Sequence, residues 1–277
     1  MRVAVVGHVE WVEFVRVAHV PVPGEIVHAD GWWEEPGGGG AGAAVQLRKL
    51  AGRSSFFTAL GDDDLGRRAR EVLAGLGVDV HAARRAEPTR RAVTHVDSSG
   101  ERTITVLGER LAPAGLDDLP WDELSGADAV YFTAGDTAAL RRARAARVLV
   151  ATSRVLPLLQ ESGVQLDALV GSANDSSERF DGTEIDPPPR LCVWTDGGEG
   201  GAFAAGGRRG RYAPVLATRV VDRYGAGDSF AAGLTYALGT GMTVDESLEL
   251  AARCGAAVIA GAGPYEGQLQ ESDLRRS

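Results

Sequence analysis

The sequence predicts an α/β fold in which a mostly parallel central sheet lies between layers of helices. Short apolar segments typical of buried strands alternate along the chain with longer amphipathic segments typical of helices. The 277 residues are also enough to bury one large core, so we expect a single domain over residues 1–277. Residues 12–33 and 92–107 break the alternation, because their patterns are typical of exposed strands and a hairpin. We expect these two segments to form a second, smaller sheet.

The predicted strands of the main sheet are short apolar runs, as expected where both faces of a parallel sheet are covered. The first is Val3–Val6, which ends at Gly7. The others cover residues 55–60, 78–80, 129–132, 148–151, 168–170 and 191–194, with a further strand end at 220–222. The glycine- and arginine-rich residues 206–211 are expected to form a loop.

The predicted helices have recognisable ends. Residues 41–50 are small and apolar at helical spacing, and Gly52 follows them. Three aspartates, residues 62–64, precede the next helical pattern, as is typical of a helix start. Residues 229–238 carry apolar side chains at helical spacing and are followed by Gly239. These segments supply the helical layers that cover a parallel sheet.

Composition excludes several classes of function. The net charge of −9 argues against binding to a nucleic-acid backbone. Lys49 is the only lysine, and its neighbours do not form a Walker A motif. Cys192 and Cys254 are far apart, so we expect two buried thiols rather than a zinc or redox site. No apolar run is long enough to cross a membrane, and we expect a cytoplasmic protein without a membrane partner.

One stretch, VVDRYGAGDSFAAG at residues 220–233, suggests chemistry. Its glycine-rich turn at residues 225–227 opens a predicted helix, whose first N–H groups are unpaired and carry partial positive charge. Glycines let an anion approach such groups closely. Asp228 stands beside the turn, where a carboxylate can accept a hydroxyl proton during phosphoryl transfer. The stretch therefore predicts an anion hole with a neighbouring base.

The same residues admit two other interpretations. Asp228 is an acid at a helix start, and such acids often serve only as N-caps. The letters Gly227-Asp228-Ser229 also resemble the nucleophile block of one class of lipases and esterases. That chemistry needs a histidine base, which that class places downstream of the serine, whereas all five histidines here lie upstream. The hydrolase interpretation is therefore weak.

The two glycine-rich stretches PGGGGAGAAVQLRKLAG and DRYGAGDSFAAG resemble the N- and C-terminal signatures of the PfkB, or ribokinase-like, carbohydrate kinases. Other segments are similar to parts of the same family. VPVPGEIVHA and SSGERTITV resemble its lid segments, and VWTDGGEGGAF resembles its nucleotide-site loop. The order and spacing of these segments agree with the family from about residue 1 to about residue 265.

The resemblance implies a three-layer α/β/α sandwich with a small β lid. It also implies transfer of the γ-phosphoryl group of ATP, with Mg²⁺, to a hydroxyl of a sugar or sugar-like small molecule. A nucleoside kinase of the same fold and a catalytically inactive ligand-binding relative are the alternatives. Some members of the family form a homodimer through the lid, and we carry that arrangement over as an expectation.

Site residues follow from the same resemblance. It implies a catalytic base at Asp228 and an anion hole at Gly225, Ala226 and Gly227. It implies nucleotide contacts at Asn174, Thr195, Gly197 and Gly200. It implies acceptor contacts at Glu10, Gly38 and Gly39, and a monovalent cation such as K⁺ at Asp222. A helix N-terminus stabilises a carboxylate, so Asp228 is expected to be a weak base that takes its proton late.

The sequence departs from the family pattern on the acceptor side. Val12 replaces a frequent aspartate, Gly39 a lysine and Gly42 an asparagine. Ser177 stands on the position of a glutamate, with Glu178 one residue later. A pocket with different polar groups predicts a substrate other than a plain pentose.

Three tryptophans also lie near the predicted lid, Trp11, Trp32 and Trp33. They suggest either stacking on a nucleoside or aryl-bearing substrate, or packing within the lid or a dimer. Arg102 in the lid is expected to be a solvated surface arginine, with an anionic ligand as the alternative.

Overall fold

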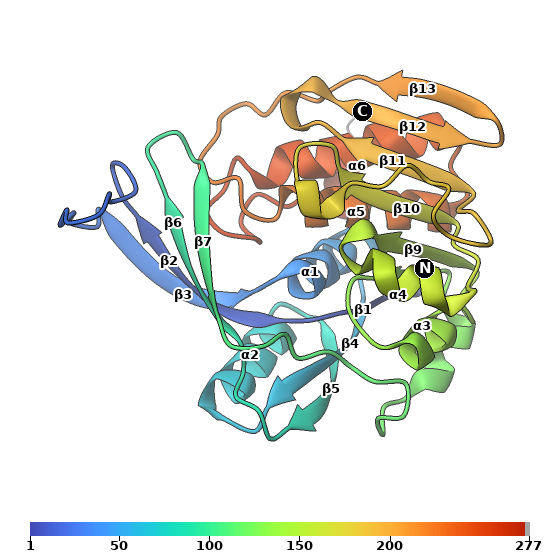
Figure 1. The fold of residues 1–277 in the computed structure, drawn as a ribbon, viewed down its shortest axis with the longest axis horizontal. Coiled ribbons are helices and arrows are strands. Elements are labelled where there is room, and N and C mark those ends of the chain that lie inside the picture. Colours follow the sequence, from blue (N-terminus) through green and yellow to red (C-terminus); the bar gives the residue numbers. More distant parts are fainter. Residues whose placement is uncertain (275–277) are drawn as a thin grey trace.

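The computed structural model describes residues 1–274 and contains a large sheet with helices on both faces and a smaller sheet at one side (Figure 1). The large sheet has the strand order β13-β12-β11-β10-β9-β8-β1-β4-β5. Its strands are β1 (Val3–Val6), β4 (Ser55–Gly61), β5 (Asp79–Arg85), β8 (Ala129–Phe132), β9 (Val148–Thr152), β10 (Ala168–Ser172), β11 (Leu191–Thr195), β12 (Gly201–Ala205) and β13 (Arg208–Tyr212). All neighbouring pairs from β5 to β11 are parallel, and only β12 and β13 run antiparallel to their neighbours.

Helices cover the two faces of the large sheet. They are α1 (Gly39–Ala51), α2 (Asp64–Gly75), α3 (Thr137–Ala143), α4 (Leu156–Ser162), α5 (Ala226–Thr240), α6 (Val244–Val258) and the short α7 (Glu271–Leu274). Val3 and Val5 of β1 pack in one core with α1, α2, α5 and α6, whereas Ala4 and Val6 pack in a second core with α3 and α4. Alternate residues of a strand face opposite sides, so the buried strands are apolar throughout.

The smaller sheet contains β2 (Glu10–Arg16), β3 (Gly31–Gly37), β6 (Arg91–Val96) and β7 (Arg102–Leu107), in the order β3-β2-β6-β7. It projects from the large sheet beside α1 and α2 (Figure 1). Phe14 of β2 stacks on Trp33 at a centroid distance of 4.9 Å and meets the ring of Tyr224 edge-on at 5.0 Å. The smaller sheet is thereby packed against the loop that precedes α5.

The structure confirms the α/β prediction and corrects three of its details. Residues 206–211 are not a loop throughout, because Gly206 and Gly207 turn the chain and β13 begins at Arg208. Residues 220–222 do not belong to a strand. The strand β2 is more buried than expected, since Val12 and Phe14 are both fully buried. Arginine-rich β13 is an edge strand, where exposed charged side chains are common.

Two of the tryptophans pack within the protein. Trp33 stacks on Phe14, and Trp11 is buried beneath the Arg68 guanidinium, which lies 4.2 Å from its ring centroid. Trp32 is 71% exposed. Cys192 and Cys254 are free and buried, as predicted. No helix within residues 1–274 is long and apolar enough to cross a membrane.

Candidate active site

The N-terminus of α5 is formed by the glycine-rich turn. Gly225 is the residue that caps the helix, and its φ of 77° lies in the left-handed region that favours glycine. The helix begins at Ala226, three residues earlier than predicted, so Gly227 and Asp228 belong to its first turn. No side chain caps this end. Its first N–H groups are therefore available to an anion, as the motif predicted.

Asp228 is half-buried, and its carboxylate forms no hydrogen bond or ion pair with any residue between 1 and 274. The backbone at the start of α1 lies against it. A Cβ atom added to Gly39 would lie 2.9 Å from Asp228 Oδ1, and one added to Gly42 would lie 3.6 Å from Asp228 Cβ. Glycine at these positions keeps space open around the carboxylate.

Burial raises the pKa of the Asp228 carboxyl above its ordinary value, although the charges of Arg154 and Arg102 lower it. The helix N-terminus alone predicted a weak base. Desolvation disfavours the charged form of a carboxylate, and this effect is the largest one here. The structure therefore makes Asp228 a stronger base than the local sequence suggested.

Neither of the other interpretations of the motif agrees with the structure. Asp228 is the third residue of the helix and does not cap it, since the capping position belongs to Gly225. Ser229 is fully buried, and its hydroxyl lies 3.5 Å from the amide nitrogen of Gln268. A buried serine next to a glutamine is not an activated nucleophile.

The predicted acceptor residues lie around the turn between β3 and α1. Gly38 has a φ of 87°, and its N–H donates to the Tyr224 hydroxyl at 2.9 Å. A Cβ added to Gly38 would lie 3.4 Å from Glu10 Cγ. Glu10 is 7% exposed and pairs with Arg90 at 3.2 Å. The structure thus brings Glu10, Gly38, Gly39 and Asp228 together, although they come from separate parts of the chain.

The predicted nucleotide residues lie at the carboxyl ends of β10 and β11. These strands are parallel, and Ser172 pairs with Thr195 in their register. Asn174 donates from Nδ2 to Asp196 Oδ1 at 3.2 Å. Gly197, with a φ of 53°, opens the short turn that follows β11. Ligands of open α/β sheets bind at this end of the strands.

Gly200 closes the same turn and packs under the neighbouring hairpin. Its φ is 80°, and an added Cβ would lie only 2.3 Å from the carbonyl oxygen of Tyr212. This contact explains why residue 200 is a glycine, and the explanation does not depend on any ligand.

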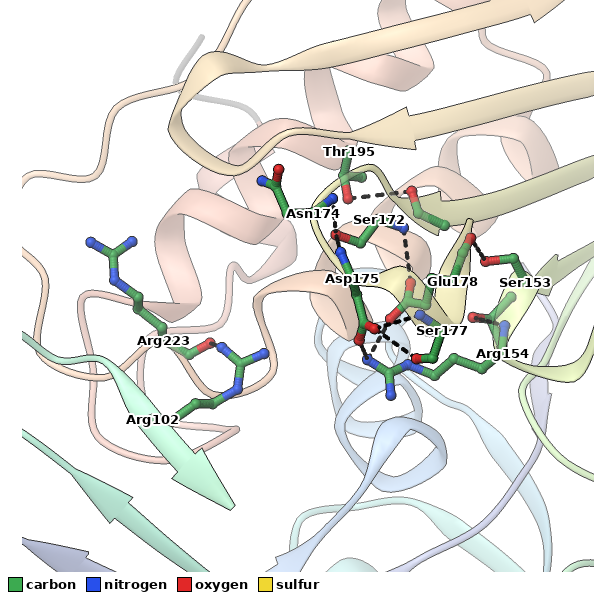
Figure 2. Close-up of polar contacts among 12 residues, drawn as sticks. Arg102, Ser153, Arg154, Ser172, Asn174, Asp175, Ser177, Glu178, Thr195 and Arg223 are labelled. Atoms are coloured by element: carbon green, nitrogen blue, oxygen red, sulfur yellow. Dashed lines mark hydrogen bonds and ion pairs between the residues drawn. The ribbon is translucent and has the colours of Figure 1, made fainter. Parts of the chain in front are cut away.

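Glu178, not Ser177, is the buried side chain of the segment after β10. The Ser172 N–H donates to Glu178 Oε2 at 2.9 Å, and the Glu178 carboxylate also pairs with Arg154 (Figure 2). Ser177 is exposed and donates from its hydroxyl to Asp175 at 2.7 Å. Compared with the family pattern, the glutamate therefore lies one residue later in the sequence, but its side chain still points inward.

Arg154 links the segment that follows β10 with Asp228. It follows β9, pairs with Glu178 and Asp175, and its charge reaches Asp228. Figure 2 shows Arg102 and Arg223 across from this group, with the Arg102 guanidinium donating to the Arg223 carbonyl at 2.9 Å. No sequence motif marks Arg154 as a site residue. The one available signal was its place just after an apolar strand, where a parallel sheet collects functional side chains.

Asp222 is fully buried and joins two loops. Its carboxylate accepts the N–H of Tyr224 at 2.8 Å and the N–H of Gly263 at 3.0 Å. Burial raises its pKa, whereas the two backbone hydrogen bonds lower it. Asp222 therefore fixes the loop that leads into α5 against the loop that follows α6.

Comparison with known proteins decides the family. The model of the pfkB family of carbohydrate kinases matches residues 1–174 and 165–271, which is nearly the whole chain. The chain belongs to the pfkB family of carbohydrate kinases. Members of this family are phosphotransferases with an alcohol group as acceptor, and the kinase described here is one of them.

Curated relatives of this kinase include sugar and sugar-phosphate kinases. An ATP-dependent ribose-1-phosphate kinase from Halopiger xanaduensis is 31% identical over 276 residues, which cover 92% of this chain and 91% of that protein. A fructokinase from Klebsiella pneumoniae is 28% identical, with coverage of 87% and 91%.

Solved structures agree with the fold of this kinase. A microbiome-derived acarbose kinase has a TM-score of 0.83 at 23% identity, with coverage of 99% of this chain and 97% of that one. Ribokinase from Arabidopsis thaliana, solved with ribose and ATP, has a TM-score of 0.77 at 21% identity, again with coverage of 99% and 97%. These similarities confirm the ribokinase-like α/β/α fold with a small β lid.

We expect a half-buried glutamate near Asp222 to make the stability of this kinase depend on pH. Glu35 accepts a hydrogen bond from Trp33 Nε1 at 2.9 Å, and burial raises its pKa to about 7. Between its unfolded pKa of 4.5 and about 7, the folded state holds a proton that the unfolded state has lost. Because the folded state binds more protons, stability falls as pH rises through this window.

We expect Glu35→Gln to remove this fall. Compared with the wild type, the melting temperature of the variant should rise by several degrees more at pH 8 than at pH 5, because only the carboxyl ionises. Thermal unfolding of both proteins at the two pH values measures the difference. Glu249→Gln changes an exposed glutamate on α6 and should show no such difference. Equal shifts for Glu35→Gln at pH 5 and pH 8 would contradict the expectation.

Proposed function

We propose that this kinase transfers the γ-phosphoryl group of ATP to a hydroxyl of a small sugar, with Asp228 as the base. One observation supports this most strongly, namely a carboxylate without a partner beside an uncapped helix start. The acceptor hydroxyl attacks the γ-phosphorus, the bond to the bridging oxygen of ADP breaks, and the hydroxyl proton passes to Asp228. The N–H groups of residues 226–228 stabilise the charge on the transferred phosphoryl group.

The remaining predicted residues have roles on either side of this centre. Glu10, Gly38 and Gly39 bind and orient the acceptor, since they surround the same space as Asp228. The nucleotide is held at the carboxyl ends of β10 and β11 by Asn174, Thr195, Gly197 and Gly200. We propose that residues 1–277 act as one kinase domain.

The site fits a hydrated Mg²⁺ carried by the nucleotide. Among residues 1–274, no group of three His, Cys, Asp or Glu side chains is placed to hold a metal ion alone. Mg²⁺ usually keeps several waters and binds phosphates with only one or two protein oxygens, which Asn174 and Asp196 can supply. When bound, Mg²⁺ neutralises charge on the phosphates. A K⁺ ion at Asp222 stays a proposal of the same kind.

The nucleoside acceptor and the homodimer through the lid also stay proposals. A nucleoside acceptor has no stacking platform in Trp11 or Trp33, because both rings are used in packing. A homodimer through the lid is compatible with β7, on which Ile104, Val106 and Leu107 are 40%, 41% and 43% exposed.

Acceptor-dependent release of ADP tests the proposed function. Purified protein with ATP and Mg²⁺ is offered a panel of pentoses, hexoses, their monophosphates and nucleosides. We expect ADP release that depends on one class of acceptor. A protein that binds ATP in calorimetry and is inactive with the whole panel would favour the alternative of an inactive ligand-binding relative.

A further inference from the structure

Tyr224 lies immediately before the glycine-rich turn of α5, and its ring packs under the lid. The residue is 5% exposed, and its ring meets Phe14 edge-on at 5.0 Å. Three further lid residues belong to the same small apolar core, namely Val12, Ala92 and Val96. Side chains two residues apart on a strand share a face, and Val12 of β2 pairs in register with Ala92 of β6. The Tyr224 ring therefore covers this face, which we call the inner face of the lid.

The hydroxyl of Tyr224 reaches the turn between β3 and α1. It accepts the Gly38 N–H at 2.9 Å. A Cβ added to Gly37 would lie 2.7 Å from this hydroxyl and 2.6 Å from Val12 Cγ2, so the tyrosine and the lid fill the space beside the turn. Burial raises the pKa of the Glu10 carboxyl, whereas nearby arginines and hydrogen bonding by the Tyr224 side chain lower it. The Tyr224 hydroxyl thus holds two of the predicted acceptor residues in place.

The backbone on both sides of the Tyr224 N–H is fixed. This N–H donates to the buried Asp222 carboxylate at 2.8 Å. The N–H of Arg223 donates at 3.0 Å to the carbonyl of Gly100, in the turn between β6 and β7. The loop before α5 is therefore joined to the lid at the tip of the lid hairpin as well as at its inner face. Tyr224 cannot leave the inner face without breaking these contacts.

Tyr224 also borders the space around Asp228. Burial raises the pKa of the Tyr224 phenol most, and the charge of Glu10 and that of Asp228 raise it further, so both carboxylates lie near its hydroxyl. Thr94 lies on the inner face of the lid, where its hydroxyl is fully buried and has no hydrogen-bond partner. A smaller residue at position 224 would therefore open a subsite with apolar walls and one free hydroxyl. Such a lining suits an apolar or aromatic substituent.

We infer that Tyr224 is a positioning and specificity-determining residue, whose hydroxyl fixes Glu10 and Gly38 beside the acceptor and whose ring excludes acceptors that carry a bulky substituent toward the lid. This inference rests on the proposed function, in which Asp228 takes the hydroxyl proton of the acceptor. Packed side chains leave few voids, so a substituent at this place has to displace the ring. Truncation of Tyr224 should therefore admit a larger acceptor, a gain that loss of stability cannot imitate.

The first test is a gain of activity on a larger acceptor. Ribose and fructose are compared with their phenyl glycosides, which keep a primary hydroxyl free, by ADP release. For the wild type, we expect kcat/KM for the better sugar to exceed that for its phenyl glycoside by roughly a hundredfold or more. In Tyr224→Ala, this ratio should fall at least about tenfold because kcat/KM for the phenyl glycoside rises. An unchanged ratio, or a wild type that uses sugar and glycoside equally well, overturns the inference and leaves the proposed function intact.

A second truncation keeps the test valid if the alanine variant does not fold. Tyr224→Leu retains part of the buried apolar volume, so its melting temperature should fall less than that of Tyr224→Ala. It should still lower the ratio of the two kcat/KM values, because leucine is shorter than tyrosine. A folded Tyr224→Leu enzyme with the ratio of the wild type overturns the role of the ring.

Tyr224→Phe tests the hydroxyl separately. It keeps the ring, so selection against the phenyl glycoside should persist, while the Gly38 N–H loses its acceptor. We expect KM for the sugar to rise about tenfold, with KM for ATP changed by less than about twofold. Tyr236→Phe is the matched control, since Tyr236 lies farther along α5, and it should change neither value. A Tyr224→Phe enzyme that loses stability without any change in the KM for the sugar overturns the positioning role.

Calorimetry separates failure of the inference from failure of the proposed function. A protein that binds ATP but releases no ADP with any acceptor contradicts the proposed function, and binding then tests the acceptor space. We expect Tyr224→Ala to bind the phenyl riboside about tenfold more tightly than the wild type does, with equal affinity for ATP. Equal binding of the phenyl riboside by both proteins, or binding by neither, overturns the inference.

Discussion

Asp228→Asn should reduce turnover by about a thousandfold while leaving the fold and ATP binding intact. General-base catalysis contributes roughly 10²–10⁴ to a rate, and Asn has the shape of Asp without its basicity. The substitution breaks no hydrogen bond or ion pair, because the carboxylate has none among residues 1–274. Burial disfavours the ionised carboxylate, as the raised pKa shows, so the variant should be at least as stable as the wild type.

Steady-state ADP release and thermal unfolding, measured on the same samples, check both parts of this expectation. Asp245→Asn is the matched control, because Asp245 also lies in the first turn of a helix but pairs with Arg208 at the surface. It should keep full activity, since exposed ion pairs contribute little. An Asp228→Asn enzyme with more than about a tenth of wild-type activity would show that another group takes the proton.

Gly227→Ala should make the protein more stable and less active. Gly227 is the second residue of α5 and is exposed, and an added Cβ would have no atom within 4 Å. Alanine is favoured over glycine in a helix by up to about 1 kcal/mol, which corresponds to a rise in melting temperature of roughly 2–4 °C. The methyl group, however, would occupy the open space where a phosphoryl group approaches the helix N–H groups. We expect turnover to fall about a hundredfold, as when one donor of an oxyanion hole is lost.

The opposite signs of the two effects make this prediction specific. Loss of activity through misfolding would lower the melting temperature, whereas obstruction of a site would not. Gly75→Ala is the matched control, because Gly75 is also helical with open space around it and lies at the end of α2. It should gain stability without losing activity. Full activity of Gly227→Ala would mean that no phosphoryl group binds at this end of α5.

Burial on both faces explains which strands could be predicted. Val3–Val6 and the apolar runs that follow it are visible in sequence because every residue of such a strand is enclosed. The edge strand β13, Arg208–Tyr212, is not visible in the sequence because its exposed arginines and its glycine are typical of a loop. Residues 220–222 were assigned to a strand because two valines suggested one, but the chain there is irregular. Apolar character alone does not distinguish a strand from a buried or half-buried loop.

The part of the candidate site that lies in one continuous stretch could be predicted from the sequence. The part that is assembled from separate segments of the chain could not. The turn and Asp228 form one continuous stretch, so their spacing is visible in the sequence. Arg90, Arg110 and Arg154 lie in three separate segments of the chain and meet only through the topology of the two sheets. The basicity of Asp228 was misjudged for the same reason, because the helix end is a local feature whereas desolvation depends on the whole fold.

The most direct test uses ATP that carries ³³P in its γ-phosphoryl group. The protein is incubated with this ATP, Mg²⁺ and the preferred acceptor, and the position of the label is measured. For the wild type, we predict that the label moves to the acceptor as a phosphate ester, with one ADP formed for each ester. For Asp228→Asn, we predict almost no transfer despite normal ATP binding. Label that appears only as inorganic phosphate, or that reaches the acceptor equally fast in both proteins, would contradict the assignment of Asp228 as the base of a sugar kinase.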